Sequence, residues 1–138
     1  MRKTVQDVMT ADPVTISRSN SVVDAARLME SADVGSVPVV DGGTPVGIVT
    51  DRDIAIRVVA KGKDPTATQV GEIATDQPYY VEPDQDLDEA LELMAYRKVR
   101  RLPVVEDGQL VGMLAQADVV HEVKEKKAAH VIEEISQP

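Results

Sequence analysis

The sequence predicts an α/β protein of the α+β type, made of two tandem β-α-β-β-α units related by a pseudo-two-fold axis. The first observation is an internal repeat: residues 5–56 align without a gap on residues 70–121, a shift of 65 positions, with 14 of 52 residues identical. Ordinary residue frequencies would give roughly three identities. The second observation is a helical spacing of apolar residues in both copies. The third is a pair of apolar strands around an Asp/Gly turn in each copy.

The first copy is expected to begin with a helical turn, because Val5, Val8 and Met9 lie on one side of such a turn. Ser21 can cap a following helix, and glycine at the turn reaches a positive φ at little cost. The predicted elements are, in order, a helical turn at 4–9, a strand at 14–16, a helix from 21, strands at 37–40 and 46–49, and a helix at 51–60. The predicted core stripe of the longer helix is Val22, Ala25, Ala26 and Met29.

The second copy repeats this order after a polar linker that contains proline and glycine. The predicted elements are a lead-in at 70–74, a strand at 79–81, a helix from 86, strands at 102–105 and 110–114, and a helix from 116 to about 129. The stripe of the helix from 86 is Leu87, Ala90, Leu91 and Met94. The expected division is a first repeat at 4–60, a linker at 61–69, a second repeat at 70–125 and a helical extension or tail at 126–138.

The bulk composition bounds the class of protein. The chain has 138 residues, a net charge of −9 and no Cys, Phe or Trp, so its core is aliphatic and it can hold no disulfide or cysteine-based zinc site. The acidic balance disfavours nonspecific binding to nucleic acid or to an acidic membrane. The beginning of the chain lacks the apolar core of a signal peptide, and no stretch approaches 18 apolar residues. A soluble, cytoplasmic protein is expected.

Each repeat contains the pattern hydrophobic-Pro-Val-Val, an Asp/Gly turn, then hydrophobic-Val-Gly followed by two apolar residues and, in the first copy, Thr50-x-x-Asp53. This pattern resembles the CBS domain, of which two copies in tandem form a Bateman module. The resemblance covers about residues 4–125. The chain as a whole resembles the stand-alone CBS pairs of prokaryotes. It implies a regulatory, non-enzymatic protein that binds an adenosine nucleotide between its repeats and forms a homodimer.

The residues themselves give a reason for nucleotide binding. A strand runs into a helix N-terminus at Thr50, where free N–H groups suit a phosphate. The Asp53 carboxylate can accept both cis-hydroxyls of a ribose, although the same pair is also an ordinary capping arrangement. The second copy keeps Asp118 but has Ala115 in place of the threonine. The two clefts should therefore be unequal.

The family resemblance implies the membership of each cleft. The main, complete cleft is expected to hold Ile48, Thr50, Asp53, Thr75, Tyr80, Val99 and Arg100. The weaker cleft is expected to hold Thr10, Thr15, Val34, Gly35, Met113 and Asp118. Arg100 could neutralise a phosphate in the main cleft, where its repeat counterpart Gly35 could not. AMP is the first expected ligand and ADP or ATP the next, with S-adenosylmethionine ranked below them and no cofactor required.

Other interpretations stay open. The basic cluster at 97–101 could be a solvated helix end, a phosphate site or, least favoured, a nucleic-acid surface. No metal site is expected, because His121 and His130 lack carboxylates at a metal-binding spacing. The chain could instead be a ligand-free module for a protein partner, which the sequence does not identify. The homodimer has a reason in the residues too, since the helix at 51–60 is rich in apolar side chains that need cover.

Overall fold

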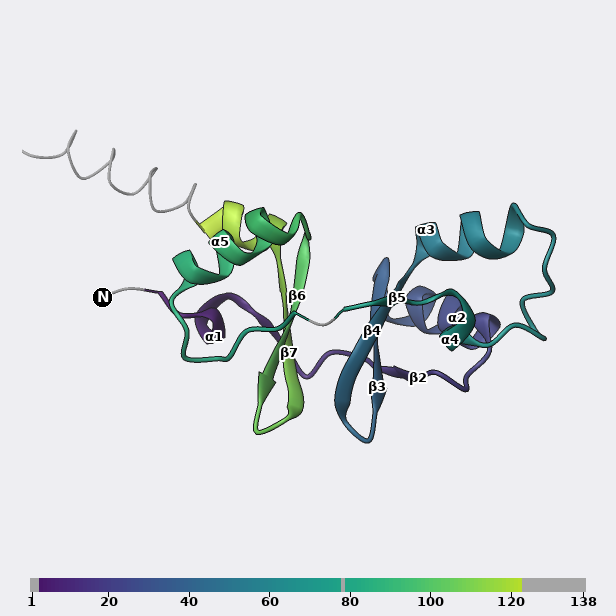
Figure 1. The fold of residues 1–138 in the computed structure, drawn as a ribbon, viewed down its shortest axis with the longest axis horizontal. Coiled ribbons are helices and arrows are strands. Elements are labelled where there is room, and N and C mark those ends of the chain that lie inside the picture. The colour runs from purple at the N-terminus through teal and green to yellow at the C-terminus, as the bar shows by residue number, and fades with distance from the viewer. Residues whose placement is uncertain (1–2, 78, 123–138) are drawn as a thin grey trace, which may run out of the picture.

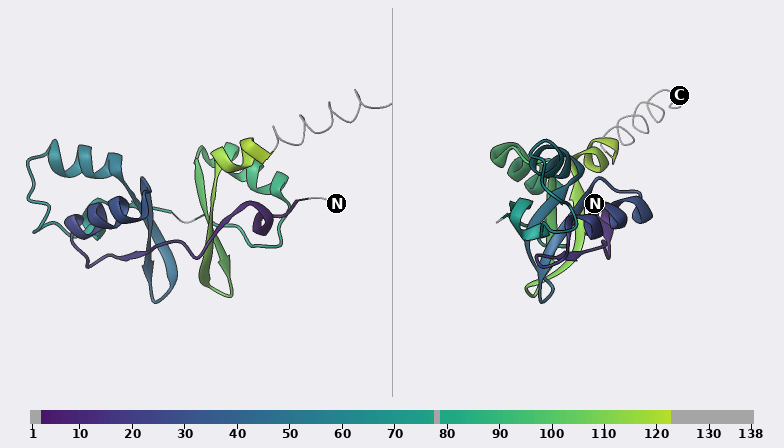
Figure 2. Two further views of the ribbon diagram at one scale, coloured as in Figure 1. Left: turned by 180° about the vertical axis from the view of Figure 1, so that it is seen from behind. Right: turned by 90° about the vertical axis from the view of Figure 1, so that its right-hand side faces the viewer.

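The computed structural model describes residues 3–77 and 79–122, and it shows two α+β units side by side along the long axis of the molecule (Figure 1). The two sheets face each other at the centre, and the helices lie on their outer sides (Figure 2). The predicted fold class is therefore confirmed. No helix among the described residues is long and apolar enough to cross a membrane.

The first unit is built on a four-stranded sheet in the order β2-β3-β4-β5. Its strands are β2 (Ile16–Ser17), β3 (Ser36–Asp41), β4 (Thr44–Thr50) and β5 (Thr75–Asp76). Its helices are α2 (Val22–Ala32), α3 (Asp51–Ile54), the π-helix η1 (Ala55–Val59) and α4 (Val70–Ile73). β2 is parallel to β3, and the other neighbours are antiparallel.

The second unit is built on a three-stranded antiparallel sheet in the order β1-β7-β6. Its strands are β1 (Thr10–Ala11), β6 (Arg101–Glu106) and β7 (Gln109–Ala115). Its helices are α1 (Val5–Val8), α5 (Leu87–Arg97) and a helix whose described part is 116–122. The predicted strand at 79–81 is not formed: Val81 makes one parallel bridge to Val104. The helix predicted from 116 to about 129 is described as far as 122, and the predicted extension at 126–138 lies outside the described residues.

The long helices form where the apolar spacing predicted them. In α2 the Ser21 side chain accepts a hydrogen bond from the Asp24 N–H, and Asp24 accepts one from the Ser21 N–H in return. This reciprocal pair satisfies two N–H groups that a helix start leaves without partners. Of the predicted stripe of α2, Ala26 is exposed, and Leu28 packs against the core in its place. The predicted stripe of α5 is confirmed, with Leu91 half-buried.

The two units exchange the segments that open each repeat, residues 4–9 and 70–74. We call these the lead-in segments. Helix α1 stands at the start of the first repeat, yet Val5 is fully buried in the core of the second unit, and β1 pairs with β7. Helix α4 opens the second repeat, yet Val70 and Ile73 are buried in the core of the first unit, and β5 pairs with β4. Each unit is therefore completed by a segment from the other repeat.

The hydrogen bonds that hold the lead-ins repeat with the 65-residue shift. Val5 N–H donates to the Gln85 carbonyl at 2.9 Å, and Val70 N–H donates to the Asn20 carbonyl at 2.8 Å. At the far end of the sheets the two hairpin turns also touch, because Leu110 N–H donates to the Gly43 carbonyl at 3.0 Å. The pseudo-two-fold axis thus relates individual contacts as well as whole elements.

The helix predicted at 51–60 is divided. It begins as α3 and continues as the π-helix η1, in which Val58 is fully buried and Ile54 packs against the first core. Ile56 and Val59 point outward and are 42% and 71% exposed. Only part of the apolar surface expected on this helix is therefore left uncovered.

Candidate functional site

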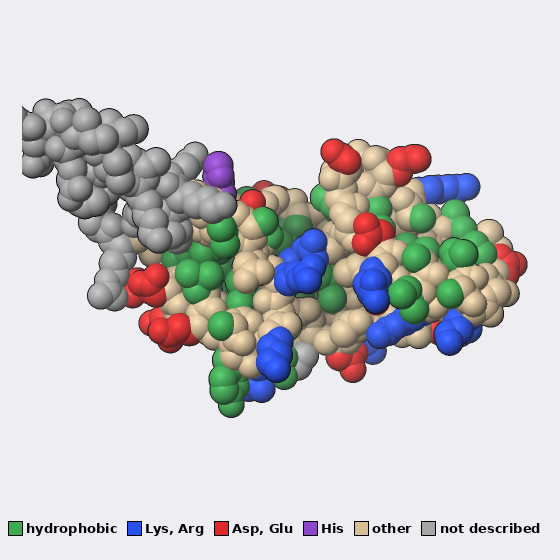
Figure 3. Space-filling model, turned by 90° about the horizontal axis from the view of Figure 1, so that it is seen from above, with side chains coloured by type: hydrophobic (Ala, Val, Ile, Leu, Met, Phe, Trp, Pro, Cys, Tyr) green, Lys and Arg blue, Asp and Glu red, His purple; other side chains and the backbone are tan. Residues whose placement is uncertain are grey.

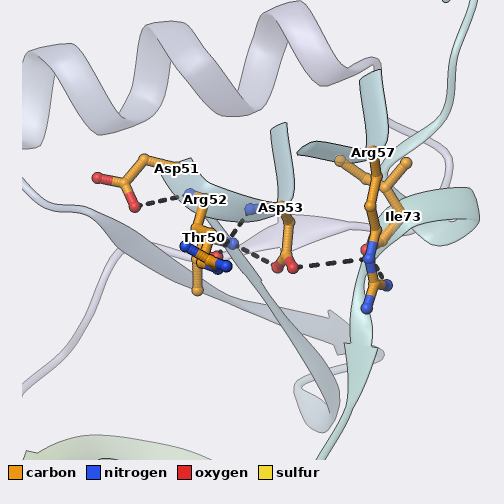
Figure 4. Close-up of polar contacts among 6 residues, drawn as sticks. All are labelled: Thr50, Asp51, Arg52, Asp53, Arg57 and Ile73. Atoms are coloured by element: carbon orange, nitrogen blue, oxygen red, sulfur yellow. Dashed lines mark hydrogen bonds and ion pairs between the residues drawn. The ribbon is translucent and has the colours of Figure 1, made fainter. Parts of the chain in front are cut away.

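The Thr50–Asp53 segment forms a closed capping arrangement at the start of α3 (Figure 4). The Thr50 N–H donates to Asp53 Oδ2 at 2.9 Å, and the Asp53 N–H donates to Thr50 Oγ1 at 3.1 Å. Asp53 Oδ1 lies 3.9 Å from Arg57 Nε, and the Asp53 side chain is 14% exposed. Arg57 in turn donates to the Ile73 carbonyl at 2.8 Å. The capping interpretation of Thr-x-x-Asp is therefore realised, and the Asp53 carboxylate is engaged on both oxygens.

The counterpart Asp118 has a different environment. It is exposed and lines a cavity of about 340 Å³ between the lead-in of the first repeat and the end of β7. We call this cavity the Asp118 cleft. Its lining residues come from both repeats and are Thr10, Asp12, Pro13, Val14, Ala32, Val34, Ser36, Pro38, Arg101, Met113, Leu114, Ala115 and Asp118.

Four of the six residues predicted for the weaker cleft line this cavity together. They are Thr10, Val34, Met113 and Asp118. The other two are not among its lining residues: Thr15 is exposed, and the Gly35 carbonyl accepts a hydrogen bond from the Asp51 N–H at 2.9 Å. The structure thus assembles most of the cleft that the sequence ranked second.

The residues predicted for the main cleft are spread over more than one region. Ile48 and Thr75 are paired across β4 and β5, and Val99 donates its N–H to the Met94 carbonyl at the end of α5. Tyr80, 53% exposed, lines a hollow of about 420 Å³ with Gln77 and Glu82. Arg100 lines a separate hollow of about 550 Å³. Of these two hollows, Tyr80 lines one and Arg100 the other.

A physical reason for the asymmetry lies in two pairs of repeat-related residues. Val14 and Ala32 line the Asp118 cleft, and their counterparts 65 positions on are Tyr79 and Arg97. The Arg97 guanidinium lies 4.3 Å from the centre of the Tyr79 ring, a cation–π contact. The Asp118 cleft thus has smaller side chains at the two positions where the other repeat carries a stacked aromatic ring and arginine.

Several residues of the Asp118 cleft were not predicted from the sequence, and Val14, Ala32 and Arg101 bear most on its chemistry. Arg101 stands at the start of β6, one residue after the arginine that the resemblance favoured. The signal that could have found it is the repeat itself, since its counterpart Ser36 lines the same cavity. The Asp118 cleft, which Arg100 does not line, therefore still has a cationic side chain in Arg101.

The cleft is chemically suited to a small polar ligand with an apolar part. Val14, Val34 and Pro38 offer apolar surface, and Thr10 offers a hydroxyl. Asp118 is a hydrogen-bond acceptor and Arg101 a donor cation, so the two can bind opposite ends of one molecule. Over the residues that the structure describes, no group of three or more His, Asp or Glu side chains is placed to hold a metal ion.

Two related units with exchanged lead-ins and a cavity between them define a tandem-repeat module built around an inter-repeat cleft. The CBS domain family matches residues 5–60 and 70–125, and the chain belongs to that family. It contains two CBS domains, as the resemblance implied.

Three similar proteins illustrate the family. The chain is 38% identical over 133 residues to the CBS domain-containing protein YhcV of Bacillus subtilis, which covers 96% of this chain and 94% of the relative. The crystal structure of CBSX2 in complex with AMP is 33% identical, with a TM-score of 0.74 over 90% of this chain and 98% of that chain. The CBS domain pair of protein MJ0100, in complex with 5′-methylthioadenosine and S-adenosyl-L-methionine, is 28% identical, with a TM-score of 0.79 over 91% and 99%.

Proposed function

We propose that this protein is a non-enzymatic regulatory module that binds an adenosine nucleotide in the Asp118 cleft. The observation that carries the proposal is that the exposed Asp118 carboxylate and Arg101 line one cavity, walled by both repeats. Such concave sites, mostly apolar with a few placed polar groups, are typical of small-molecule binding. CBSX2 with AMP and MJ0100 with two adenosine derivatives support this ligand class.

Each part of a nucleotide has a matching group in the cleft. Asp118 can accept hydrogen bonds from both cis-hydroxyls of a ribose. Val14 and Val34 offer apolar contact to the base, and Arg101 can bind a phosphate through its planar fork of donors. AMP is the smallest nucleotide that uses all of these groups. The cleft predicted around Asp53 is the second candidate, because the Asp53 carboxylate has acceptor sites left beside its contacts with Thr50 and Arg57.

The regulatory part of the proposal follows from where the cleft lies. Because its walls come from both repeats, a bound ligand stabilises one orientation of the repeats. A ligand shifts such an equilibrium only as far as it prefers one orientation over another. A partner protein that contacts both units would then sense the ligand without touching it.

The test is binding of AMP, ADP, ATP and S-adenosylmethionine to the full chain. Binding is measured by the shift in thermal unfolding and by titration calorimetry. A ligand at 100 times its dissociation constant adds about 2.7 kcal/mol of stability. Asp118→Ala should abolish the shift, and Asp53→Ala should leave it. The reverse pattern would move the site to the Asp53 cleft. No binding by any of the four would refute the ligand site and favour a ligand-free interaction module.

We propose further that the protein is a cytoplasmic homodimer that uses the exposed apolar residues Ile56 and Val59 of η1 in its interface. Covering exposed apolar groups of this kind lowers the free energy and so stabilises the dimer. Light scattering should give twice the chain mass at micromolar concentration, and Val59→Lys should weaken the dimer. A monomer at that concentration would contradict this part of the proposal.

A further inference from the structure

A second hollow adjoins the Asp118 cleft. It has a volume of about 550 Å³, and Arg101 and Ala115 line both spaces. The residues that line only the second hollow include Arg100, Gln116 and His121. Arg101 and Ala115 therefore border both hollows.

The second hollow is suited to an anion. Among the residues that the structure describes, its lining contains two arginines and no Asp or Glu, although the chain carries 24 acidic residues and a net charge of −9. The hollow around Tyr80, by contrast, is lined by Glu82 and Asp107. Lys and Arg side chains gather at the middle of the upper face, where the surface is indented between the units (Figure 3). Arginine clusters of this kind recognise phosphate through paired N–H donors.

Backbone contacts fix this arrangement. Arg101 pairs with Ala115 across β6 and β7, and the Gln116 N–H donates to the Arg100 carbonyl at 2.8 Å. Arg100 thus lies beside Gln116, the residue that follows Ala115. Ala115 stands where the first repeat has Thr50. Its methyl group borders both hollows and can neither donate nor accept a hydrogen bond.

We propose that the second hollow is the subsite for the β- and γ-phosphates of an adenosine nucleotide whose nucleoside lies in the Asp118 cleft. The proposal rests on the proposed function and makes it more specific. Arg101 contacts the first phosphate, and Arg100 contacts the phosphates beyond it. The cleft therefore prefers ATP and ADP to AMP, which reverses the order expected from the sequence.

The experiment is isothermal titration of the full chain with ATP, ADP and AMP, in parallel with Arg100→Gln and Arg27→Gln. Arg27 is an exposed arginine of α2 outside both hollows, so its substitution controls for the same change in net charge. A charged hydrogen bond at a solvent-accessible site corresponds to roughly a tenfold change in affinity. ATP should bind about tenfold more tightly than AMP. Arg100→Gln should remove that difference without changing AMP binding, and Arg27→Gln should preserve it.

The outcomes separate this inference from the proposed function. Equal affinities for ATP and AMP, unchanged in Arg100→Gln, would overturn the subsite and leave the nucleotide site intact. Equal losses of ATP affinity in the two arginine variants would also overturn it, because they would show a general charge effect. If none of the three nucleotides bound, both proposals would fail together.

Discussion

A Cβ atom on Gly47 would lie 2.8 Å from the carbonyl oxygen of Thr75, so β5 can lie beside β4 only because position 47 has no side chain. The second repeat has the same relationship: a Cβ on Gly112 would lie 3.0 Å from the Thr10 carbonyl oxygen. These glycines, repeated at the 65-residue shift, admit the exchanged strands.

Gly47→Ala should destabilise the protein by about 1–3 kcal/mol, the usual cost of inserting a methyl group into a packed site. Urea unfolding would measure the change. The clash involves the Thr75 carbonyl, so the same cost is expected when Thr75 is also replaced by Ala. A cost that disappeared in the Thr75→Ala background would show that the side chain, and not the backbone, is in the way.

Ile73→Ala tests the exchange of lead-ins. Ile73 belongs to the second repeat in sequence, but it is 1% exposed in the core of the first unit, and its removal should cost about 2–5 kcal/mol. Glu92→Ala, at an exposed position of α5, should change the free energy of unfolding by less than about 0.5 kcal/mol. Similar values for the two variants would contradict the packing described for α4.

Asp53→Ala and Asp118→Ala should differ in their effect on stability. Asp53 accepts a hydrogen bond from the Thr50 N–H and faces Arg57, so its loss should cost about 1 kcal/mol. Asp118 is exposed, and its substitution should stay within about 0.5 kcal/mol. Chemical unfolding in the absence of nucleotide would check both. A larger loss from Asp118→Ala would indicate a structural role and weaken its assignment to ligand binding.

The stability of the fold should fall in acid. The backbone hydrogen bond from Thr4 and that from Ser21 are the largest causes that hold the pKa of Asp7 and of Asp24, respectively, below the ordinary value of 3.8. A carboxyl with a lowered pKa stabilises the folded state above its unfolded pKa, and this contribution is lost as the pH falls through the folded pKa. Unfolding measured from pH 6 down to pH 2 should show the loss below about pH 4.

Asp24→Asn is the matched control for the acid effect. The variant should be less stable than the original chain at pH 6 and should lose less stability between pH 5 and pH 2, because it cannot be protonated there. The same slope in both proteins would show that other carboxyl groups dominate the acid response.

The local elements could be predicted from the sequence because their causes are local. The spacing of Val22, Ala25 and Met29 and the cap at Ser21 are enough to specify α2, and the Asp/Gly turns specify the hairpins. The exchange of α1 and α4 could not be predicted, since a four-residue helix with one apolar side fits either core equally well. The π-helix at Ala55–Val59 has no sequence signal that we can identify.

The candidate site was predicted in part. The resemblance brought Thr10, Val34, Met113 and Asp118 together, and the structure lines one cavity with them. It could not show that Tyr79 and Arg97 stack in the related position, because that contact joins a segment after β5 to the end of α5. Such side-chain contacts join segments far apart in the chain, so a sequence pattern does not reveal them.

The reciprocal lead-ins also bear on how such a chain could arise by duplication. A single unit with its own lead-in would lack the contacts that Val5 and Val70 make here, and it could complete its core only by trading that segment with another copy. The simplest ancestor is therefore a swapped pair of identical chains, a common and inexpensive form of dimer. Fusion of two gene copies would make this exchange of lead-in segments intramolecular. The paired positions Thr50 and Ala115, or Ala32 and Arg97, could then diverge.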